Sequence, residues 1–117
     1  MTYLLIFIGG GLGAGSRFFL SNLLGNSSIF GFAISTFIVN IIGCFLIGFF
    51  IAENLEFSKS LQLFFVIGFL GSFTTFSTFT KEAILFYEQI GIMESLVYIF
   101  MTLIFCLIST YISYRLF

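Results

Sequence analysis

Four long apolar stretches follow one another along the chain, at roughly residues 2–22, 31–52, 61–88 and 94–115. A helix needs about 20 mainly apolar residues to cross the hydrocarbon core of a bilayer, so each stretch is long enough to span it. The third stretch changes character in the middle, where serine and threonine crowd the segment Gly71–Phe79. Polar or broken backbone at membrane depth is tolerated only where protein buries it or where it lines a wet cavity. The pattern therefore predicts four transmembrane helices, the third of them broken at mid-membrane around an ion site.

The overall composition agrees with a membrane location. Hydrophobic residues make up 60% of the 117 residues and charged residues only 8%, with a mean hydropathy of +1.21. Soluble domains carry roughly a quarter charged residues, which this chain lacks. Because the four spans use almost the whole chain, we expect an all-α integral membrane protein with one domain, residues 1–117. No nucleic-acid partner is expected.

Several other classes of protein do not fit. The first span has no Lys or Arg before its apolar run and carries Arg17 near its far end, the reverse of a signal peptide. The chain has no His and no clustered carboxylates, so neither a transition-metal site nor a catalytic centre is expected, and the chain is not expected to be an enzyme. Cys44 and Cys106 fall inside spans as small apolar thiols and indicate no disulfide framework.

The basic residues are balanced between the two sides of the membrane. Counting spans places Lys59 and Arg115 on one side, and Arg17 and Lys81 toward the other. The excess of Lys and Arg normally sets orientation, and two against two gives no preference. Either lipid or a partner decides the orientation, or the chain inserts both ways and pairs with an inverted copy of itself.

Small residues dominate the first span, from Gly9 to Gly15. Glycines four apart, such as Gly9 and Gly13, let helix backbones approach closely in lipid. No Gly-Lys-Ser/Thr follows the glycines, so a phosphate-binding loop is not indicated. Arg17 has two interpretations, a side chain that reaches to the membrane interface or a fixed cation that attracts anions into a pore mouth.

The second and third spans hold the strongest candidates for an ion pathway. Asn40 is an amide within an apolar run, with Thr36 one turn earlier on the same helical face. Asn40 could hold two helices together or line a lumen, and residue chemistry leaves both open. Phe76 and Phe79 lie three apart on one face, among hydroxyl residues. Because an aromatic ring is positive at its edge, rings presented edge-on favour an anion.

Three sequence runs, taken together, resemble a known family. They are Gly9-Gly10-x-x-Gly13-Ala14-x-x-Arg17, Thr36-x-x-Val39-Asn40-x-x-Gly43-x-Phe45 and Gly68-Phe69-Leu70-Gly71-Ser72-Phe73-Thr74-Thr75-Phe76-Ser77-Thr78-Phe79. In order and spacing they resemble the signatures of the CrcB/Fluc fluoride channel family, and the four-span length matches nearly end to end. Phe18 stands where a Tyr is usual and Ser35 where a Gly is often found.

The resemblance implies an antiparallel, dual-topology homodimer with two fluoride pathways. The third-span breaks would cross at the bilayer centre, where the backbone carbonyls of Gly71 and Thr74 from both chains would hold one structural Na⁺. Arg17 would enrich anions at the vestibule. The implied pathway residues are Asn40, Phe76, Phe79, Thr36, Ser77, Thr78, Tyr98 and Thr102.

The fourth span resembles the family's polar track less closely. Tyr98, Thr102 and Cys106 recur every four residues, but a thiol stands where a hydroxyl is commoner. A thiol is a weaker donor, so the place of Cys106 in the track is open. The roles of Glu82 and Lys81, just after the third run, are also open, and an ion pair of Glu82 with Lys81 or Arg17 is one possibility.

The function that this resemblance implies is passive fluoride export across a bacterial plasma membrane, which lowers cytoplasmic fluoride. Two alternatives belong to other classes. One is a subunit of an obligate heterodimeric fluoride channel that works only beside a paralogous chain. The other is a small dual-topology drug antiporter, which would need a carboxylate in the first span, and none lies between Met1 and Arg17.

Overall fold

The computed structural model describes residues 1–25, 28–52 and 58–117, and every regular element among them is a helix. Four helical segments are long and apolar enough to cross a membrane, at Thr2–Leu24, Phe30–Ala52, Lys59–Gln89 and Ile92–Leu116. Within the described residues, the prediction of an all-helical chain with four long apolar spans is therefore confirmed, and it is consistent with a membrane protein. The elements are α1 (Thr2–Leu24), α2 (Ile29–Ala52), α3 (Lys59–Leu61), η1 (Gln62–Leu70), α4 (Gly71–Phe73), α5 (Phe76–Gln89) and α6 (Ile92–Leu116).

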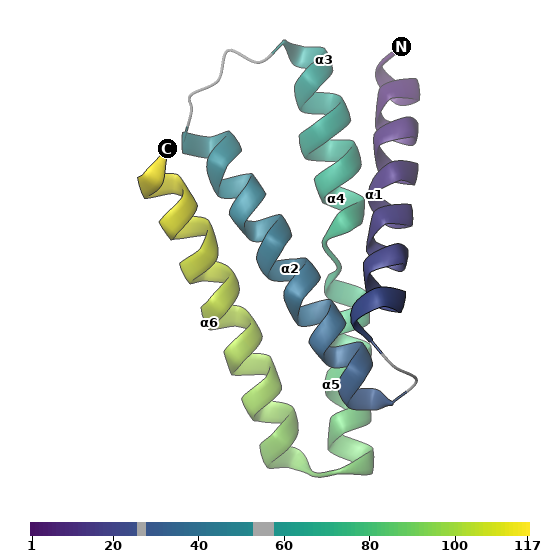
Figure 1. Cartoon of the computed structure of the whole chain (residues 1–117), viewed down its shortest axis with the longest axis vertical. Coiled ribbons are helices and arrows are strands. Elements are labelled where there is room, and N and C mark those ends of the chain that lie inside the picture. Colours follow the sequence, from purple (N-terminus) through teal and green to yellow (C-terminus); the bar gives the residue numbers. More distant parts are fainter. Residues whose placement is uncertain (26–27, 53–57) are drawn as a thin grey trace.

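The bundle is elongated, with extents of 47 × 30 × 20 Å, and its helices run along the long axis (Figure 1). Both termini and the start of α3 lie at one end of the bundle, while α5 and α6 meet at the other end. Lys59 begins α3 and Arg115 lies in the last turn of α6, so these two basic residues share one end.

The third span is built from four consecutive elements. The short α3, the π-helix η1 and the short α4 run end to end as far as Phe73. Thr74 (φ −77°, ψ 150°) and Thr75 (φ −143°, ψ 120°) are extended, and α5 begins at Phe76. The Thr75 hydroxyl caps α5 by accepting a hydrogen bond from the Thr78 amide at 3.2 Å. The nine-residue π-helix was not predicted from the sequence. Such i→i+5 geometry is rare and is frequent at functional sites.

Glycine allows α1 to pack closely on η1. Gly9 and Gly13 are buried, and a Cβ at either position would collide with the backbone of η1, with the carbonyl oxygen of Phe64 and of Phe69 respectively. At Gly15, an added Cβ would have no described heavy atom within 4 Å outside its own helix and immediate neighbours. The predicted use of small residues for close packing thus applies to one side of α1 only.

Hydroxyl groups and a glycine join α6 to α2. The Ser109 hydroxyl donates to the Ile41 carbonyl at 2.9 Å, and the Thr110 hydroxyl donates to the Cys44 carbonyl at 3.0 Å. A Cβ at Gly48 would collide with the Thr110 carbonyl oxygen, which shows how closely the two backbones approach. These contacts fix the register of α6 against α2 along the cavity described next.

Candidate functional site

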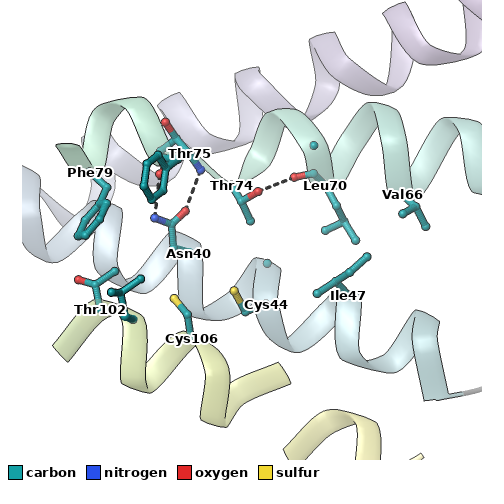
Figure 2. Close-up of a pocket in the computed structure, with 14 residues that line it drawn as sticks. Asn40, Cys44, Ile47, Val66, Leu70, Thr74, Thr75, Phe79, Thr102 and Cys106 are labelled. Carbon is teal, nitrogen blue, oxygen red and sulfur yellow. Dashed lines mark hydrogen bonds between the residues drawn. The ribbon is translucent and has the colours of Figure 1, made fainter. Parts of the chain in front are cut away.

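Asn40 holds the extended turn of the third span in place. Its Nδ2 donates to the Thr75 carbonyl at 3.0 Å, and its Oδ1 accepts from the Thr75 amide at 2.8 Å (Figure 2). A single side chain on α2 thereby pairs with both backbone polar groups of Thr75, its amide N–H and its carbonyl oxygen. Nδ2 carries two hydrogens, and one of them makes this bond, so the amide has a second N–H to offer. Asn40 thus makes the interhelical contact that was one of its two predicted roles.

The hydrogen bonds at this turn leave two backbone carbonyl oxygens without the amide donors that a continuous helix would give them. In a continuous α-helix the Thr75 amide would bond to the Gly71 carbonyl, and the Thr78 amide to the Thr74 carbonyl. Here the Thr75 amide donates to Asn40 Oδ1, and the Thr78 amide donates to the Thr75 hydroxyl. The carbonyl oxygens of Gly71 and Thr74 therefore lose their helical donors. These are the two residues for which a sodium-binding role was predicted.

A cavity of about 380 Å³ lies beside this turn, between α2, the third span and α6 (Figure 2). It gathers four of the predicted pathway residues, Asn40, Phe76, Phe79 and Thr102, together with Gly71 and Thr74. Gly71 and Phe76 are exposed, so the cavity is open to the outside of the single chain along this side. The complete lining is Asn40, Gly43, Cys44, Ile47, Val66, Leu70, Gly71, Thr74, Thr75, Phe76, Phe79, Thr102, Leu103 and Cys106.

Thr102 contributes an unused polar group to the cavity wall. The residue is only 4% exposed, and within the described chain its Oγ1 has no hydrogen-bond partner. A buried hydroxyl without a partner costs free energy, so such groups usually meet a ligand or water. The Thr74 hydroxyl is different, because it donates to the Leu70 carbonyl at 2.9 Å.

A row of aromatic rings leads away from the cavity along α5. The ring centroids of Phe76 and Phe79 are 5.5 Å apart, those of Phe79 and Tyr98 5.4 Å, and those of Tyr98 and Phe86 5.2 Å. Phe86 and Tyr98 also line a second cavity of about 460 Å³ between α2, α5 and α6. The row of rings therefore joins two hollow regions of the bundle.

Glu82 sits beside this row and binds two of the predicted pathway residues. Its side chain is 2% exposed and accepts hydrogen bonds from the Thr36 hydroxyl at 2.8 Å and the Tyr98 hydroxyl at 2.7 Å. The hydrogen bonds that the structure shows for Glu82 thus come from hydroxyl groups, and an ion pair with Lys81 or Arg17 stays a prediction. Sequence reasoning missed this cluster because Thr36 and Glu82 are 46 residues apart and lie on different spans.

The remaining predicted pathway residues lie outside the first cavity. Ser77 is exposed on α5, and the Thr78 hydroxyl accepts from the Thr75 hydroxyl at 3.0 Å. Arg17 is half-buried on α1, the helix that packs mainly against η1 and α4. In contrast, Cys106, whose place was open, does line the cavity.

Comparison with known proteins identifies the family. The family model described as "CrcB-like protein, Camphor Resistance (CrcB)" matches residues 4–114, nearly the whole chain. The chain belongs to the CrcB family. The CrcB match agrees with the resemblance seen in the three sequence runs.

Curated relatives of this CrcB chain carry a functional name. A protein of Oceanobacillus iheyensis is 37% identical over 116 residues, covering 97% of this chain and 88% of the relative. One from Ruminiclostridium cellulolyticum is 40% identical, covering 85% and 78%, and one from Rhodopseudomonas palustris is 43% identical, covering 76% and 74%. Each is named "Fluoride-specific ion channel FluC", which describes an ion channel rather than an enzyme.

Proposed function

We propose that this CrcB-family chain is a fluoride-specific ion channel that lets fluoride leave the cell passively. The observation that carries the proposal is the cavity beside the extended turn, which brings Asn40, Thr102, Phe76 and Phe79 together. Fluoride binds its hydration water tightly, so a pathway must replace that water with hydrogen-bond donors and positive ring edges. The second N–H of Asn40 and the hydroxyl of Thr102 are such donors.

Selectivity follows from the same lining. The described lining consists of aliphatic, aromatic, glycine, amide, hydroxyl and thiol residues, and none of these carries a positive charge. A larger, weakly hydrated halide such as chloride gains little free energy from the two hydrogen-bond donors, Asn40 and Thr102, and it needs a wider passage. A rigid, narrow pathway therefore favours fluoride over chloride.

The active form that we propose is an antiparallel, dual-topology homodimer. The cavity of the single chain is open along Gly71 and Phe76, and Phe76 is 70% exposed although it belongs to the lining. A second, inverted copy seated on this side would close the opening and add its own rings to the pathway, with the same patch used on both subunits. The balance of two basic residues at each side of the membrane is consistent with insertion in both orientations.

In this dimer, the extended turns of the two third spans would meet at the bilayer centre and hold one structural Na⁺. Gly71 and Thr74 would supply backbone carbonyl oxygens, which suit a hard cation. The fit rests on the hydrogen bonds that direct the Thr75 and Thr78 amides away from these carbonyls. The sodium ion would neutralise the carbonyl dipoles and hold the two turns together.

The setting that we propose is the plasma membrane of a bacterium, with residues 1–117 forming one transmembrane domain. Four apolar spans support a multi-pass membrane protein, and the named relatives are bacterial. Fluoride enters cells as neutral HF and ionises in the cytoplasm. A passive fluoride pathway would then lower cytoplasmic fluoride without any energy source.

The test is fluoride efflux from liposomes in which this purified chain is the only protein. We expect rapid efflux, followed with a fluoride electrode, that needs no proton gradient and no second polypeptide. Efflux that appears only after a paralogous chain is added would show an obligate heterodimer. Transport of a cationic drug that depends on a proton gradient, without fluoride efflux, would show an antiporter.

Phe76→Ile should reduce fluoride efflux at least tenfold while the dimer stays assembled. The substitution removes the positive ring edge from the pathway, and the side chain is so exposed in the single chain that it contributes little to the fold. The matched control is Phe100→Ile, at a residue that is 58% exposed on α6 and lies outside the cavity lining in the described chain. Equal efflux from both variants would remove Phe76 from the pathway.

A further inference from the structure

The two cysteines of the chain meet inside the cavity. Cys44 lies on α2 and Cys106 on α6, 62 positions apart in the sequence, yet their side chains lie near each other on the wall of the cavity (Figure 2). Both residues are partly buried and belong to the cavity lining. The chain has no other cysteine, so this placement brings every thiol to one point.

The surrounding structure holds the pair in register. The hydroxyl of Thr110, one turn after Cys106, donates to the backbone carbonyl of Cys44 at 3.0 Å. Ser109 makes a second bond to α2 at 2.9 Å, and Gly48 allows the two helices to approach closely. The separation of the two sulfurs is therefore set by the helix contact and does not depend on a loop.

We propose that Cys44 and Cys106 form a two-coordinate site for a soft divalent cation of the mercuric type. Thiolate sulfur prefers soft cations. Binding breaks two S–H bonds, forms two metal–sulfur bonds and releases two protons to solvent, with no change of oxidation state. With metal–sulfur bonds of about 2.3 Å, a linear unit needs roughly 4.6 Å between the two sulfurs, which two neighbouring side chains can reach by rotation.

The ion class follows from charge and ligand number. Among the described residues, no three His, Cys, Asp or Glu side chains cluster, so an ion that requires three or four protein ligands finds no site. The neighbouring walls include the apolar Ile47, Val66 and Leu70. Two thiolates and one divalent ion make a neutral complex, which costs least in such surroundings. A monovalent soft ion would leave a net negative charge there.

The functional consequence rests on the proposed function, because the site shares its cavity with Asn40, Phe79 and Thr102. An ion held between α2 and α6 would occupy space beside the donors through which fluoride passes. We therefore expect mercuric ion to stop fluoride efflux and dithiothreitol to restore it.

The binding test uses the purified full chain and mercuric chloride, independently of transport. Free thiols are counted after each sub-stoichiometric addition. The intact chain should lose two thiols per ion and saturate at one ion per chain. Cys44→Ser and Cys106→Ser should lose one thiol per ion and release it at glutathione concentrations roughly 100-fold lower, because the second intramolecular ligand is gone. Loss of one thiol per ion in the intact chain, or equal retention by the single variants, would overturn the site.

Liposome efflux then tests the block, with each variant compared with its own untreated rate. Inhibition that is present in the intact chain and absent in the Cys44→Ser/Cys106→Ser double variant supports a block from this site. Undiminished fluoride efflux from a chain that has bound one mercuric ion would overturn the proposal that this site blocks the pathway. If untreated protein passes no fluoride, the proposed function fails, and the thiol count still decides the metal site.

Discussion

Asn40→Ala should loosen the extended turn of the third span and lower both stability and fluoride efflux. The variant removes the only side chain that bonds to the Thr75 amide and carbonyl in the described structure. An unpaired buried backbone group costs about 1–3 kcal/mol in proteins generally. Hydrogen bonds between membrane helices average about 0.6 kcal/mol, so we expect a total loss of about 2 kcal/mol. The thermal unfolding midpoint in detergent measures this loss.

Thr102→Val is the matched control for Asn40→Ala. Its hydroxyl lines the same cavity but has no hydrogen-bond partner in the described chain, so its removal should leave the unfolding midpoint equal or higher. Fluoride efflux should still fall, because a donor to the ion is lost. An Asn40→Ala variant as stable as the native chain would contradict the proposed role in holding the turn.

Asn40→Asp is a less informative substitution than Asn40→Ala. A carboxylate at this position would repel the anion and so lower fluoride efflux. However, it would also place an oxygen against the Thr75 carbonyl, where Nδ2 now donates at 3.0 Å. Loss of efflux would then have two causes, so the alanine and valine pair separates the roles better.

Gly13→Ala should prevent α1 from seating on η1. The added methyl group would collide with the Phe69 carbonyl, and backbone cannot move aside as a flexible side chain can. Overpacking costs about 1–3 kcal/mol, and a rigid backbone neighbour puts this site at the upper end. The expected result is a large fall in the yield of monodisperse protein and in the unfolding midpoint.

Gly15→Ala, two residues along the same helix, is the control. No described atom outside its own helix and neighbours lies within 4 Å of its added Cβ, so the substitution meets open space. Both variants gain helix propensity of about 0.8–1 kcal/mol from replacing glycine. The unfolding midpoint should therefore rank Gly15→Ala at or above the native chain, with Gly13→Ala well below. Equal midpoints would contradict the packing of α1.

The four spans could be predicted because span length and hydropathy are local properties of the sequence. The residues with extended backbone, Thr74 and Thr75, belong to the hydroxyl-rich segment Gly71–Phe79, where the sequence predicted a polar interruption of the third span. The π-helix η1 could not be predicted, because its sequence is as apolar and helix-compatible as that of an α-helix.

Asn40, Phe76, Phe79 and Thr102 could be named from the sequence as pathway candidates, but the contacts that surround them could not. Asn40 and Thr75 are 35 residues apart, and their pairing depends on how α2 lies against the third span. The same holds for the bonds of Glu82 to Thr36 and Tyr98. A helical face can be read from spacing, whereas contact between two spans requires their relative rotation and depth, which a single sequence does not contain.

The most direct test of the account compares fluoride and chloride efflux from one batch of liposomes that contain only this chain. We expect fluoride to leave within seconds, while chloride efflux stays at the leak rate of protein-free liposomes. Equal efflux of the two halides, or fluoride retained as in protein-free liposomes, would contradict it.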